Sequence, residues 1–376
     1  MLNYEYPPLG GGAARAMAHL LEQFAGQSEL QIDVIASSTD SERVVRRAEN
    51  VTVHLLNIGK SGSIHYQTMP ELLRYSYVAW RRGKTLMENE QYDLCHAFFG
   101  IPCGLVAQPM GLPYIVSLRG SDVPFYNERF LVLDRLLFRW LSRRVWKGAG
   151  AVVANSRGLR RLSWRTAPCQ QIEVIPNGVD TDKFHPDGSG QGSLRVLCVA
   201  RLIPRKRIDL LIRAVVALRE EGVRLTVVGE GPEEERLKAL ARNEGILGRV
   251  DFTGYVPHDQ LPVVYRNHDV FALPSENEGM SNTALEAMAS GLALIMPRTG
   301  GADELLVDGK NGVLMESGTT AQMIMALIRY CSDPALLKDH GNHSRQIAEG
   351  MSWGSVANRY ERLYRAVSGN QGGLSR

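Results

Sequence analysis

The chain has 376 residues, of which 44% are hydrophobic and 22% are charged, and its formal net charge at pH 7 is +3. Its length predicts two domains, because a single hydrophobic core rarely grows so large, and its composition excludes an intrinsically disordered chain. The mild positive charge gives no sign of a nucleic-acid partner. Five cysteines without CxxC spacing, no signal peptide and no apolar run of membrane-spanning length favour a cytoplasmic protein.

The first half of the chain has the pattern of an α/β domain, in which apolar runs of strand length alternate with segments of helical period. The runs cover residues 32–36, 114–118, 151–154 and 172–175. Only MLNYEY precedes the first Gly-rich turn, so we expect a short or incomplete first strand. In that turn Gly11 and Gly12 would let the backbone approach a phosphate or a sugar closely, whereas a glycine triplet alone is also an ordinary flexible turn.

The segment 129–165 is strongly basic, with ten lysines or arginines and Asp134 as its only acid. The cations are Arg129, Arg135, Arg139, Arg143, Arg144, Lys147, Arg157, Arg160, Arg161 and Arg165. Phe138, Trp140 and Trp146 are interleaved with these cations in a predicted helix. A similar mixture occurs at residues 74–84, RYSYVAWRRGK. Such segments suit an anionic membrane surface, and the alternative is a solvated basic helix whose aromatic side chains pack into the core.

The second half of the chain follows a stretch rich in glycine and serine at residues 185–193, which predicts a linker. We therefore expect one α/β domain at 1–188 and a second at 189–350, each with a doubly wound parallel sheet. The strands of the second domain are expected near 194–200, 223–228, 250–253, 269–273 and 292–296. A helix at 351–367 and a disordered tail at 368–376 should complete the chain.

Two cations stand where the first strand of the second domain would end. Arg201 follows the apolar run 194–200 directly, and Lys206 lies five residues further on, before a periodic helical segment. Ligands of open α/β sheets bind beyond the carboxyl ends of the strands, so both side chains are placed to clamp a diphosphate. Ordinary solvated loop cations are the alternative.

The segment EGMSNTALEAMASG, residues 278–291, holds Glu278 and Glu286 eight positions apart. On a helix they share one face, about 12 Å apart along the axis. A short apolar run and a glycine-containing turn precede the segment, so the backbone N–H groups of residues 279–282 would face a ligand at a helix N-terminus. Carboxylates beside a phosphate-binding terminus suit a nucleotide-sugar. By spacing alone, two solvated glutamates on an amphipathic helix are the alternative.

The order and spacing of several motifs resemble those of glycosyltransferase family 4, the retaining enzymes with the GT-B fold, over nearly the whole chain. The motifs are YEYPPLGGG at 4–12, YDLCHAFF at 92–99, SLRGSDVP at 117–124, ANS at 154–156, VIPNGVDTDKF at 174–184, ARLIPRK at 200–206, VVGEGPEEERL at 227–237, FTGYVP at 252–257 and the two-glutamate segment. The resemblance implies two Rossmann-like domains that face each other across a cleft. The first would bind the acceptor and the second the nucleotide-sugar, and the last helix would cross back to the first.

The resemblance also implies roles for individual residues. Glu278 would hydrogen-bond the hydroxyls of the donor sugar, and Glu286 those of the ribose. Arg201 and Lys206 would stabilise the charge that grows on the leaving diphosphate, and with Glu278 they are the expected catalytic residues. The expected donor-binding residues are Gly11, Gly12, Val256, Gly279, Met280, Ser281, Asn282 and Glu286. This chemistry needs no metal and no cofactor besides the nucleotide-sugar, and we identify no protein nucleophile.

The first domain departs from the family pattern at two positions. Arg119 in SLRGSD replaces a histidine that commonly contacts the donor sugar, and it would either bind an anionic group near the reaction centre or pair with Asp122 or Glu128. His96 keeps the first position of a histidine pair, whereas Phe98 replaces the second. His96 would either line the acceptor cleft or be a hydrogen-bonded histidine at a strand end.

Two further patterns could suggest a metal, and we expect neither to bind one. Asp180 and Asp182 form a DxD triplet, but it lies close to the linker and outside the expected site. His340 and His343 have helical spacing without a plausible third ligand, and we expect exposed side chains there.

Together these features predict a retaining hexosyltransferase that uses a nucleoside-diphosphate sugar and a glycan or lipid-linked acceptor in cell-surface polysaccharide assembly, of the lipopolysaccharide type. It would be cytoplasmic, with peripheral contact to the inner face of the plasma membrane through 129–165. The alternatives are a non-catalytic GT-B protein that scaffolds a membrane glycan-assembly complex, and a sugar-nucleotide epimerase.

Overall fold

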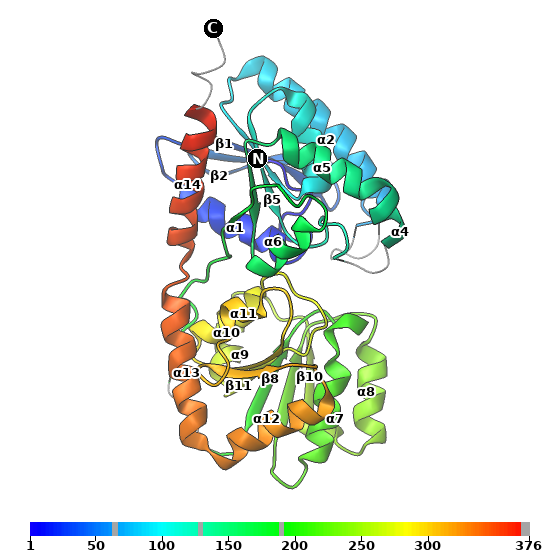
Figure 1. Ribbon diagram of the computed structural model, residues 1–376, viewed down its shortest axis with the longest axis vertical. Coiled ribbons are helices and arrows are strands. Elements are labelled where there is room, and N and C mark those ends of the chain that lie inside the picture. The colour runs from blue at the N-terminus through cyan, green and yellow to red at the C-terminus, as the bar shows by residue number, and fades with distance from the viewer. Residues whose placement is uncertain (62–66, 127–130, 188–191, 370–376) are drawn as a thin grey trace. The chain divides into compact units, whose positions relative to one another are not determined.

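The computed structural model describes residues 1–61, 67–126, 131–187 and 192–369. The chain forms two compact units (Figure 1). Unit 1 comprises Met1–Asn177 and Trp353–Arg376, and unit 2 comprises Gly178–Ser352. Each unit is an α/β domain with its own apolar core, which confirms the predicted fold class.

The sheet of unit 1 is mainly parallel. Its strands are β1 (Ile32–Ser38), β2 (Arg43–Ala48), β3 (Val51–Asn57), β4 (Cys95–Phe98), β5 (Tyr114–Leu118), β6 (Ala151–Ala154) and β7 (Glu173–Val174). They run in the order β2–β3–β1 and β4–β5–β6–β7, and only β2 is antiparallel to its neighbour. Leu2 bridges the two groups, since it pairs with both Ile35 and Ala97. The opening residues therefore occupy a central strand position, and the pairing there is as short as expected.

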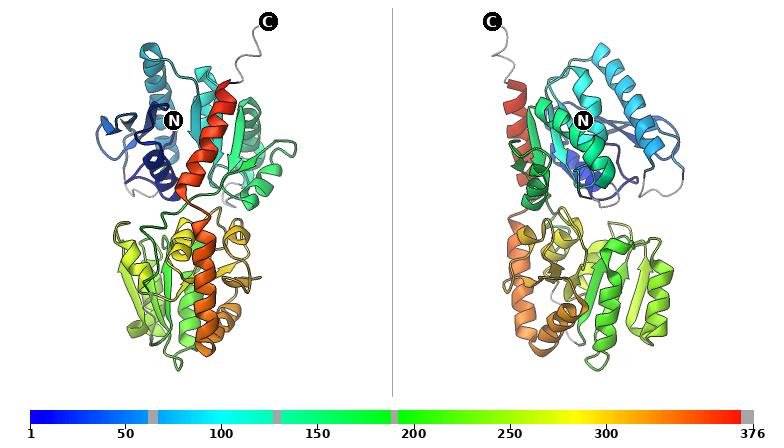
Figure 2. Two further views of the ribbon diagram at one scale, coloured as in Figure 1. Left: turned by 90° about the vertical axis from the view of Figure 1, so that its left-hand side faces the viewer. Right: turned by 45° about the vertical axis from the view of Figure 1, so that its right-hand side comes forward.

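Helices cover both faces of this sheet. They are α1 (Gly12–Phe24), α2 (Met69–Asn89), α3 (Leu105–Ala107), α4 (Leu131–Leu133), α5 (Arg139–Gly148), α6 (Arg157–Trp164) and α14 (Trp353–Gly369). The last helix packs against α1 and contributes Trp353, Tyr360 and Tyr364 to the core of unit 1 (Figure 2). Elsewhere, α2 and α5 both pack against the irregular helical turn Gly100–Gly104.

Unit 2 has a fully parallel sheet. Its strands are β8 (Arg195–Val199), β9 (Arg224–Val228), β10 (Val250–Gly254), β11 (Val270–Ala272), β12 (Ala293–Pro297) and β13 (Gly312–Met315), in the order β10–β9–β8–β11–β12–β13. Its helices are α7 (Ile208–Ala217), α8 (Glu234–Asn243), α9 (Leu261–Arg266), α10 (Asn282–Ala289), α11 (Ala302–Leu305), α12 (Thr320–Ser332) and α13 (Pro334–Glu349). The strand order reverses between β8 and β11, which creates a switch point at their carboxyl ends.

The units divide earlier than the expected boundary at 188/189. Phe184 belongs to the core of unit 2, and the Val179 N–H donates to the Met351 carbonyl at 2.8 Å, so the segment after Asn177 packs with the second unit. Residues 188–191 of the expected linker lie outside the described residues, as do residues 370–376 of the expected tail. The helix expected at 351–367 is α14.

Candidate active site

The switch point of unit 2 brings two loops of the chain together. One follows β8 and carries Arg201 and Lys206; the other follows β11 and carries Glu278. In an open parallel sheet the carboxyl ends of adjacent strands lie at one edge, where ligands bind. The structure thus places three of the sequence-predicted residues at the edge where the sheet topology favours a ligand.

The loop after β8 is held against the loop after β9. The Leu202 N–H donates to the Glu230 carbonyl at 2.9 Å. Gly229 has φ +129° and lies so close to β8 that a Cβ there would be 2.0 Å from the Ala200 carbonyl oxygen. Only glycine permits this approach. Arg201 itself is exposed at the edge.

Lys206 and Glu278 form an ion pair between the Lys206 Nζ and the Glu278 Oε1. Both side chains are about nine-tenths buried, with 11% and 12% of their surface exposed. Burial alone would raise the pKa of Glu278, but Lys206 and Arg205 hold it below the ordinary value. The carboxylate is therefore ionised near neutral pH and oriented by its lysine partner.

Backbone contacts fix the Glu278 loop. The Arg205 Nη1 donates to the Asn277 carbonyl at 2.9 Å, and the Glu276 N–H donates to the Arg205 carbonyl at 2.9 Å. On the other side, a Cβ at Gly300 would lie 1.9 Å from the Glu278 carbonyl oxygen. The loops after β8 and β12 therefore hold Glu278 between them.

The helix α10 begins directly after this loop. Gly279, Met280 and Ser281 are buried, and the Ser281 hydroxyl caps the helix by accepting the Ala284 N–H at 3.2 Å. Asn282 is the first helical residue. An N-terminus of this kind favours an anion, because its first amides and the helix dipole direct positive potential outward.

Glu286 lies further along α10, buried and fully engaged. Its Oε1 lies 2.9 Å from the His258 Nε2, and its Oε2 accepts the Tyr265 hydroxyl at 2.9 Å. Tyr265 lies in α9 and His258 shortly before it, and Val256, two residues before His258, is half-buried. The Tyr255 N–H donates to the Glu230 Oε1 at 3.3 Å, which ties this segment to the loop after β9.

The residues predicted in unit 1 are placed differently. Gly11 precedes α1 as its N-terminal cap and donates its N–H to the Glu5 Oε2 at 3.1 Å. Gly12 is the first residue of that helix and is exposed. Both follow the central strand position at its carboxyl end, which is where a ligand of this unit would bind.

His96 is enclosed within unit 1, as in the second of its two interpretations. Its Nδ1 lies 2.7 Å from the Tyr364 hydroxyl and its Nε2 lies 2.7 Å from the Ser117 hydroxyl. Burial and the positive charge of Arg119 lower the pKa of His96 well below the ordinary value, so the ring is neutral at pH 7. Only 2% of the residue is exposed.

Arg119 follows β5 and reaches toward α14. Its Nη1 donates to the Asn177 Oδ1 at 2.9 Å and its guanidinium carbon lies 4.3 Å from the centre of the Phe98 ring. Asp122 accepts the backbone N–H of Arg119 at 2.9 Å and forms no ion pair with its side chain in the described part of the chain. Glu128 lies outside the described residues. The two departures from the family pattern, Phe98 and Arg119, thus contact each other.

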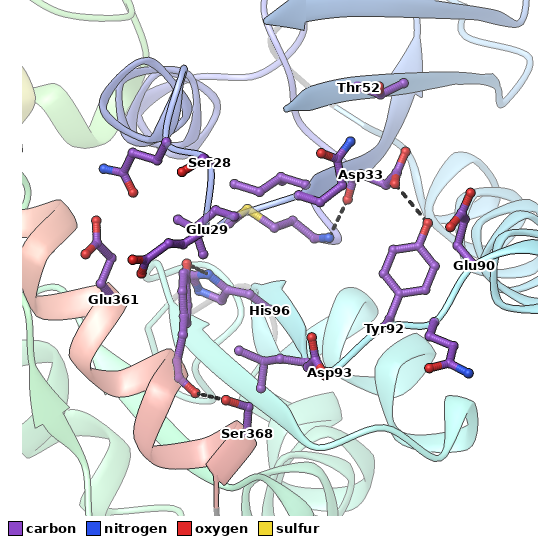
Figure 3. A pocket seen from close by; sticks show the side chains of 18 of the residues that line it. Ser28, Glu29, Asp33, Thr52, Glu90, Tyr92, Asp93, His96, Glu361 and Ser368 are labelled. Atoms are coloured by element: carbon purple, nitrogen blue, oxygen red, sulfur yellow. Dashed lines mark hydrogen bonds between the residues drawn. The ribbon is translucent and has the colours of Figure 1, made fainter. Parts of the chain in front are cut away.

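A hollow of about 1260 Å³ lies at the opposite, amino-terminal edge of the unit 1 sheet (Figure 3). Asp33, at the start of β1, accepts the Tyr92 hydroxyl there at 2.8 Å. Of the sequence-predicted site residues, only His96 borders it. The hollow is separated from the carboxyl edge by the strands, so it is not the site that the motifs predict.

The patterns that could suggest a metal have local structural roles. Asp180 closes a turn, since its Oδ1 accepts the N–H groups of Asp182 and Lys183 at 3.1 and 3.0 Å. The expectation of an exposed His340 was wrong: the side chain is buried, and its Nδ1 lies 2.8 Å from the Tyr330 hydroxyl. Within the described ranges, no three His, Cys, Asp or Glu residues form a group that could hold a metal ion.

Sequence reasoning missed the residues that hold the site together: Arg205, Glu230, His258 and Tyr265. Arg205 and Glu230 stand inside the quoted motifs, one residue from Lys206 and between two glycines, so their positions carried a signal. The contact of His258 and Tyr265 with Glu286 depends on how α9 packs beside α10, and no spacing in the sequence reveals it.

Comparison with known proteins assigns the chain to a family. Residues 10–183 match the family model described as Glycosyltransferase Family 4, and residues 180–347 match that of Glycosyl transferases group 1. A GDP-mannose-dependent alpha-(1-6)-phosphatidylinositol monomannoside mannosyltransferase of Mycolicibacterium smegmatis is 34% identical over 52% of this chain and 56% of its own length. A D-inositol 3-phosphate glycosyltransferase of Actinosynnema mirum is 26% identical over 86% of this chain and 84% of its own length. The chain spans 56–62% of the length of this mannosyltransferase and of two relatives with the same name from Mycobacterium tuberculosis.

Solved structures agree on the fold. A sucrose-phosphate synthase from Thermosynechococcus elongatus superposes with a TM-score of 0.87 at 21% identity, covering 98% of each chain. The catalytic domain of starch synthase IV from Arabidopsis thaliana superposes with a TM-score of 0.74 at 16% identity, again covering 98% of each chain. Together the two family models match residues 10–347, so the chain belongs to glycosyltransferase family 4, and its fold is GT-B.

Proposed function

We propose that this chain transfers a hexosyl group from a nucleoside-diphosphate sugar to a hydroxyl of a glycan or lipid-linked acceptor, with retention at the anomeric carbon. Cell-surface polysaccharide assembly at the cytoplasmic side of the membrane is the proposed setting. The observation that carries the proposal is the meeting of Arg201, the Lys206–Glu278 pair and the start of α10 at the switch point of unit 2. Neither a scaffold nor a structural protein needs this arrangement.

In the proposed reaction the glycosidic C–O bond of the donor breaks and the electron pair stays on the diphosphate. Arg201, Lys206 and the first amides of α10 would stabilise that growing charge. The acceptor oxygen bonds to the anomeric carbon, and its proton passes to the leaving phosphate, which is the route that family resemblance implies. Glu278 would bind hydroxyls of the sugar.

Glu286 is the proposed ligand of the ribose hydroxyls. Its two oxygens are already hydrogen-bonded to His258 and Tyr265, so the carboxylate is oriented before a nucleotide binds. A carboxylate oxygen has more than one lone pair, and each can accept a second hydrogen bond from a ribose hydroxyl. The segment Tyr255–Val256 is proposed to meet the base, next to Glu230.

GDP-mannose is the first donor to test, because two relatives, 34% and 32% identical to this chain, are named GDP-mannose-dependent alpha-(1-6)-phosphatidylinositol monomannoside mannosyltransferases. That name also supports a lipid-linked acceptor. Arg119 is proposed to lie on the acceptor or sugar side. His96 is buried and hydrogen-bonded to Ser117 and Tyr364, so its proposed role is to hold these neighbours in place and not to contact the substrate.

The test is a product assay with GDP-mannose, UDP-glucose and ADP-glucose, each offered with a glycolipid extract or without acceptor. Proton NMR of the product should show an α-linkage, as retention from an α-configured donor requires. Lys206→Met should lower the rate about 100-fold or more, while Lys238→Met, which removes a surface cation on α8, should not. Conversion of the donor without acceptor would indicate an epimerase, and no turnover of any donor would favour the scaffold.

A further inference from the structure

The helix α2 carries an apolar stripe on its outer side. Glu71, Tyr75, Ala79 and Gly83 face the core, and large apolar residues are exposed away from them. The exposed residues are Met69, Leu73, Tyr77 and Trp80, with Leu73 65% exposed. Their spacing places them within a quarter of the helical circumference. Single exposed apolar residues are common on protein surfaces, but four of them on one side of a helix form a contiguous apolar patch. Such a patch indicates a contact surface.

The helical segment 131–148 repeats this arrangement. Asp134, Val145 and Trp146 are buried, while five apolar residues of its first half are exposed. They are Val132, Leu133, Leu136, Leu137 and Trp140, with Leu136 76% exposed. The sequence left open whether the aromatic residues here face a membrane or pack into the core. Trp146 packs into the core, whereas Trp140 is 57% exposed.

The two stripes lie at the same end of unit 1. Because β3 is the strand before α2 in the chain and β4 is the strand after it, α2 runs from the carboxyl edge of the sheet to the amino edge. The segment 131–148 precedes β6 and runs the same way. Both pack against Gly100–Gly104, so they are near neighbours. In each, the exposed apolar residues come first, near the carboxyl edge, where Figure 1 shows α4.

Cations follow the apolar residues on both helices. Arg81 and Lys84 lie in the second half of α2, and Arg144 and Lys147 in the second half of α5. The Arg81 guanidinium lies 5.9 Å from the centre of the Tyr77 ring, and that of Arg144 lies 5.9 Å from the Trp140 ring. Asp134, the only acid of 131–148, is buried and accepts the Phe125 N–H.

We propose that this apolar-basic face, formed by α2 and residues 131–148, docks unit 1 onto an anionic lipid bilayer. The apolar residues at the helix starts would enter the boundary between headgroups and acyl chains, and the cations one to three turns later would meet lipid phosphates. Arginines stacked on aromatic rings suit this depth, since the ring can be half-immersed while the cation stays at the headgroups. Among the described residues, none of the helices combines the length and the apolar character that a membrane span requires.

Lipid fits this face better than nucleic acid or a second protein. A nucleic-acid surface would need cations among exposed polar groups, whereas here nine large apolar side chains lead the face. A protein interface is depleted in charge at its centre, whereas here lysines and arginines follow the apolar residues on both helices. Glu88, near the end of α2, is an exposed acid, and the cations outnumber it, which suits a negatively charged bilayer. The proposal does not depend on the transferase activity, because it rests on side chains outside the switch point.

The test is co-sedimentation of the full chain with vesicles of phosphatidylcholine, alone or mixed with phosphatidylglycerol. The wild type should bind the mixed vesicles, bind phosphatidylcholine alone at least tenfold more weakly, and lose binding as salt is raised. Leu73→Ser with Leu136→Ser should weaken binding about tenfold, and Arg81→Gln with Lys147→Gln should do the same. The matched control, Val263→Ser with Met325→Ser, removes similarly exposed apolar residues from unit 2 and should bind as the wild type does.

Circular dichroism and thermal unfolding should show that all variants fold alike, and stabilisation by a donor nucleotide should be the same in each. Vesicle binding that is equal in wild type and variants, or equal with and without phosphatidylglycerol, would overturn the proposal. An absence of vesicle binding would also overturn it. In that case, RNA binding would identify the face as a nucleic-acid surface, and a concentration-dependent dimer in light scattering that Leu73→Ser with Leu136→Ser abolishes would identify it as a contact between two copies of the chain.

Discussion

The ion pair between Lys206 and Glu278 is buried enough that each side chain depends on the other. Removing the lysine leaves an uncompensated carboxylate, and such losses destabilise proteins by about 3–5 kcal/mol. We therefore expect Lys206→Met to lower the free energy of unfolding by about 3 kcal/mol at pH 7. The double variant Lys206→Met with Glu278→Leu should recover most of that loss. Urea unfolding of the wild type, Lys206→Met, Glu278→Leu and the double variant measures the coupling, and additive effects would show that the pair does not interact.

His96 gives unit 1 a defined response to acid. Burial lowers the pKa of its ring in the folded protein. Below pH 6.5 the ring is therefore protonated in the unfolded chain while it stays neutral in the folded chain. The contribution of the neutral His96 ring to the free energy of unfolding is fully present above the ordinary pKa near 6.5. It falls as the pH drops below that value, by up to about 1.4 kcal/mol per pH unit. His96→Gln should be less stable at pH 7.5, yet its stability should decline less between pH 6.5 and 5.

The comparison needs a second histidine as its control. His343→Gln changes a ring on the surface of α13 whose Nδ1 lies 2.9 Å from the Asp339 carbonyl oxygen, and the decline in stability assigned to His96 should remain in this variant. A His96→Gln profile that runs parallel to that of the wild type would contradict the assignment of His96 as a buried neutral histidine. The same result would reopen the interpretation in which His96 lines the acceptor side.

At the scale of elements, the loop after β12 should matter as much for donor binding as the loop that carries Glu278. A Cβ at Gly300 would overlap the Glu278 carbonyl, and the Gly301 N–H donates to that carbonyl at 3.2 Å. Gly300→Ala should therefore displace Glu278 and weaken donor binding at least tenfold, while global stability changes by about 1–3 kcal/mol. Gly248→Ala, at a glycine with open space around its Cα, should leave binding unchanged. Calorimetry of donor binding by both variants would decide between these expectations.

Five of the six strands of unit 2 were predicted, and β13 was not. The strands β8, β11 and β12 were predictable because they are buried on both faces and appear as continuous apolar runs. Leu197 and Cys198 are typical of such runs. In unit 1, β2, β3 and β4 were not predicted. β2 (RVVRRA) lies at the sheet edge, is antiparallel and is largely exposed, so charges interrupt its apolar pattern. Edge strands are decided by their neighbours more than by their own residues.

The apolar-basic face was predictable only in part. Charge counting finds the cations of 129–165, but it cannot tell that Trp146 turns inward while Leu136 and Trp140 face outward. That distinction depends on which side of the helix meets the Gly100–Gly104 turn. Likewise the charge pattern allows an ion pair of Arg119 with Asp122, whereas Asp122 binds backbone N–H groups and Arg119 stacks on Phe98.

For the whole molecule, the division of the chain depends on packing and not on linker composition. The Gly- and Ser-rich stretch suggested a boundary at 188/189, but Val179 and Phe184 already belong to unit 2. The C-terminal helix returns to unit 1 because Trp353, Tyr360 and Tyr364 are large apolar surfaces that complete its core. Its helical period showed that a helix exists, and the family resemblance supplied its destination.

The central claim is that unit 2 binds a nucleoside-diphosphate sugar at the switch point, with Glu286 on the ribose. The most direct measurement is a thermal-shift titration of the wild type and Glu286→Gln with GDP-mannose, UDP-glucose and ADP-glucose. A donor at about 100 times its Kd should stabilise the wild type by about 2.7 kcal/mol. We expect one nucleotide class to do so and Glu286→Gln, folded but with a weakened ribose contact, to lose most of the shift. Equal shifts in both proteins, or no shift with any donor in a folded wild type, would contradict the account.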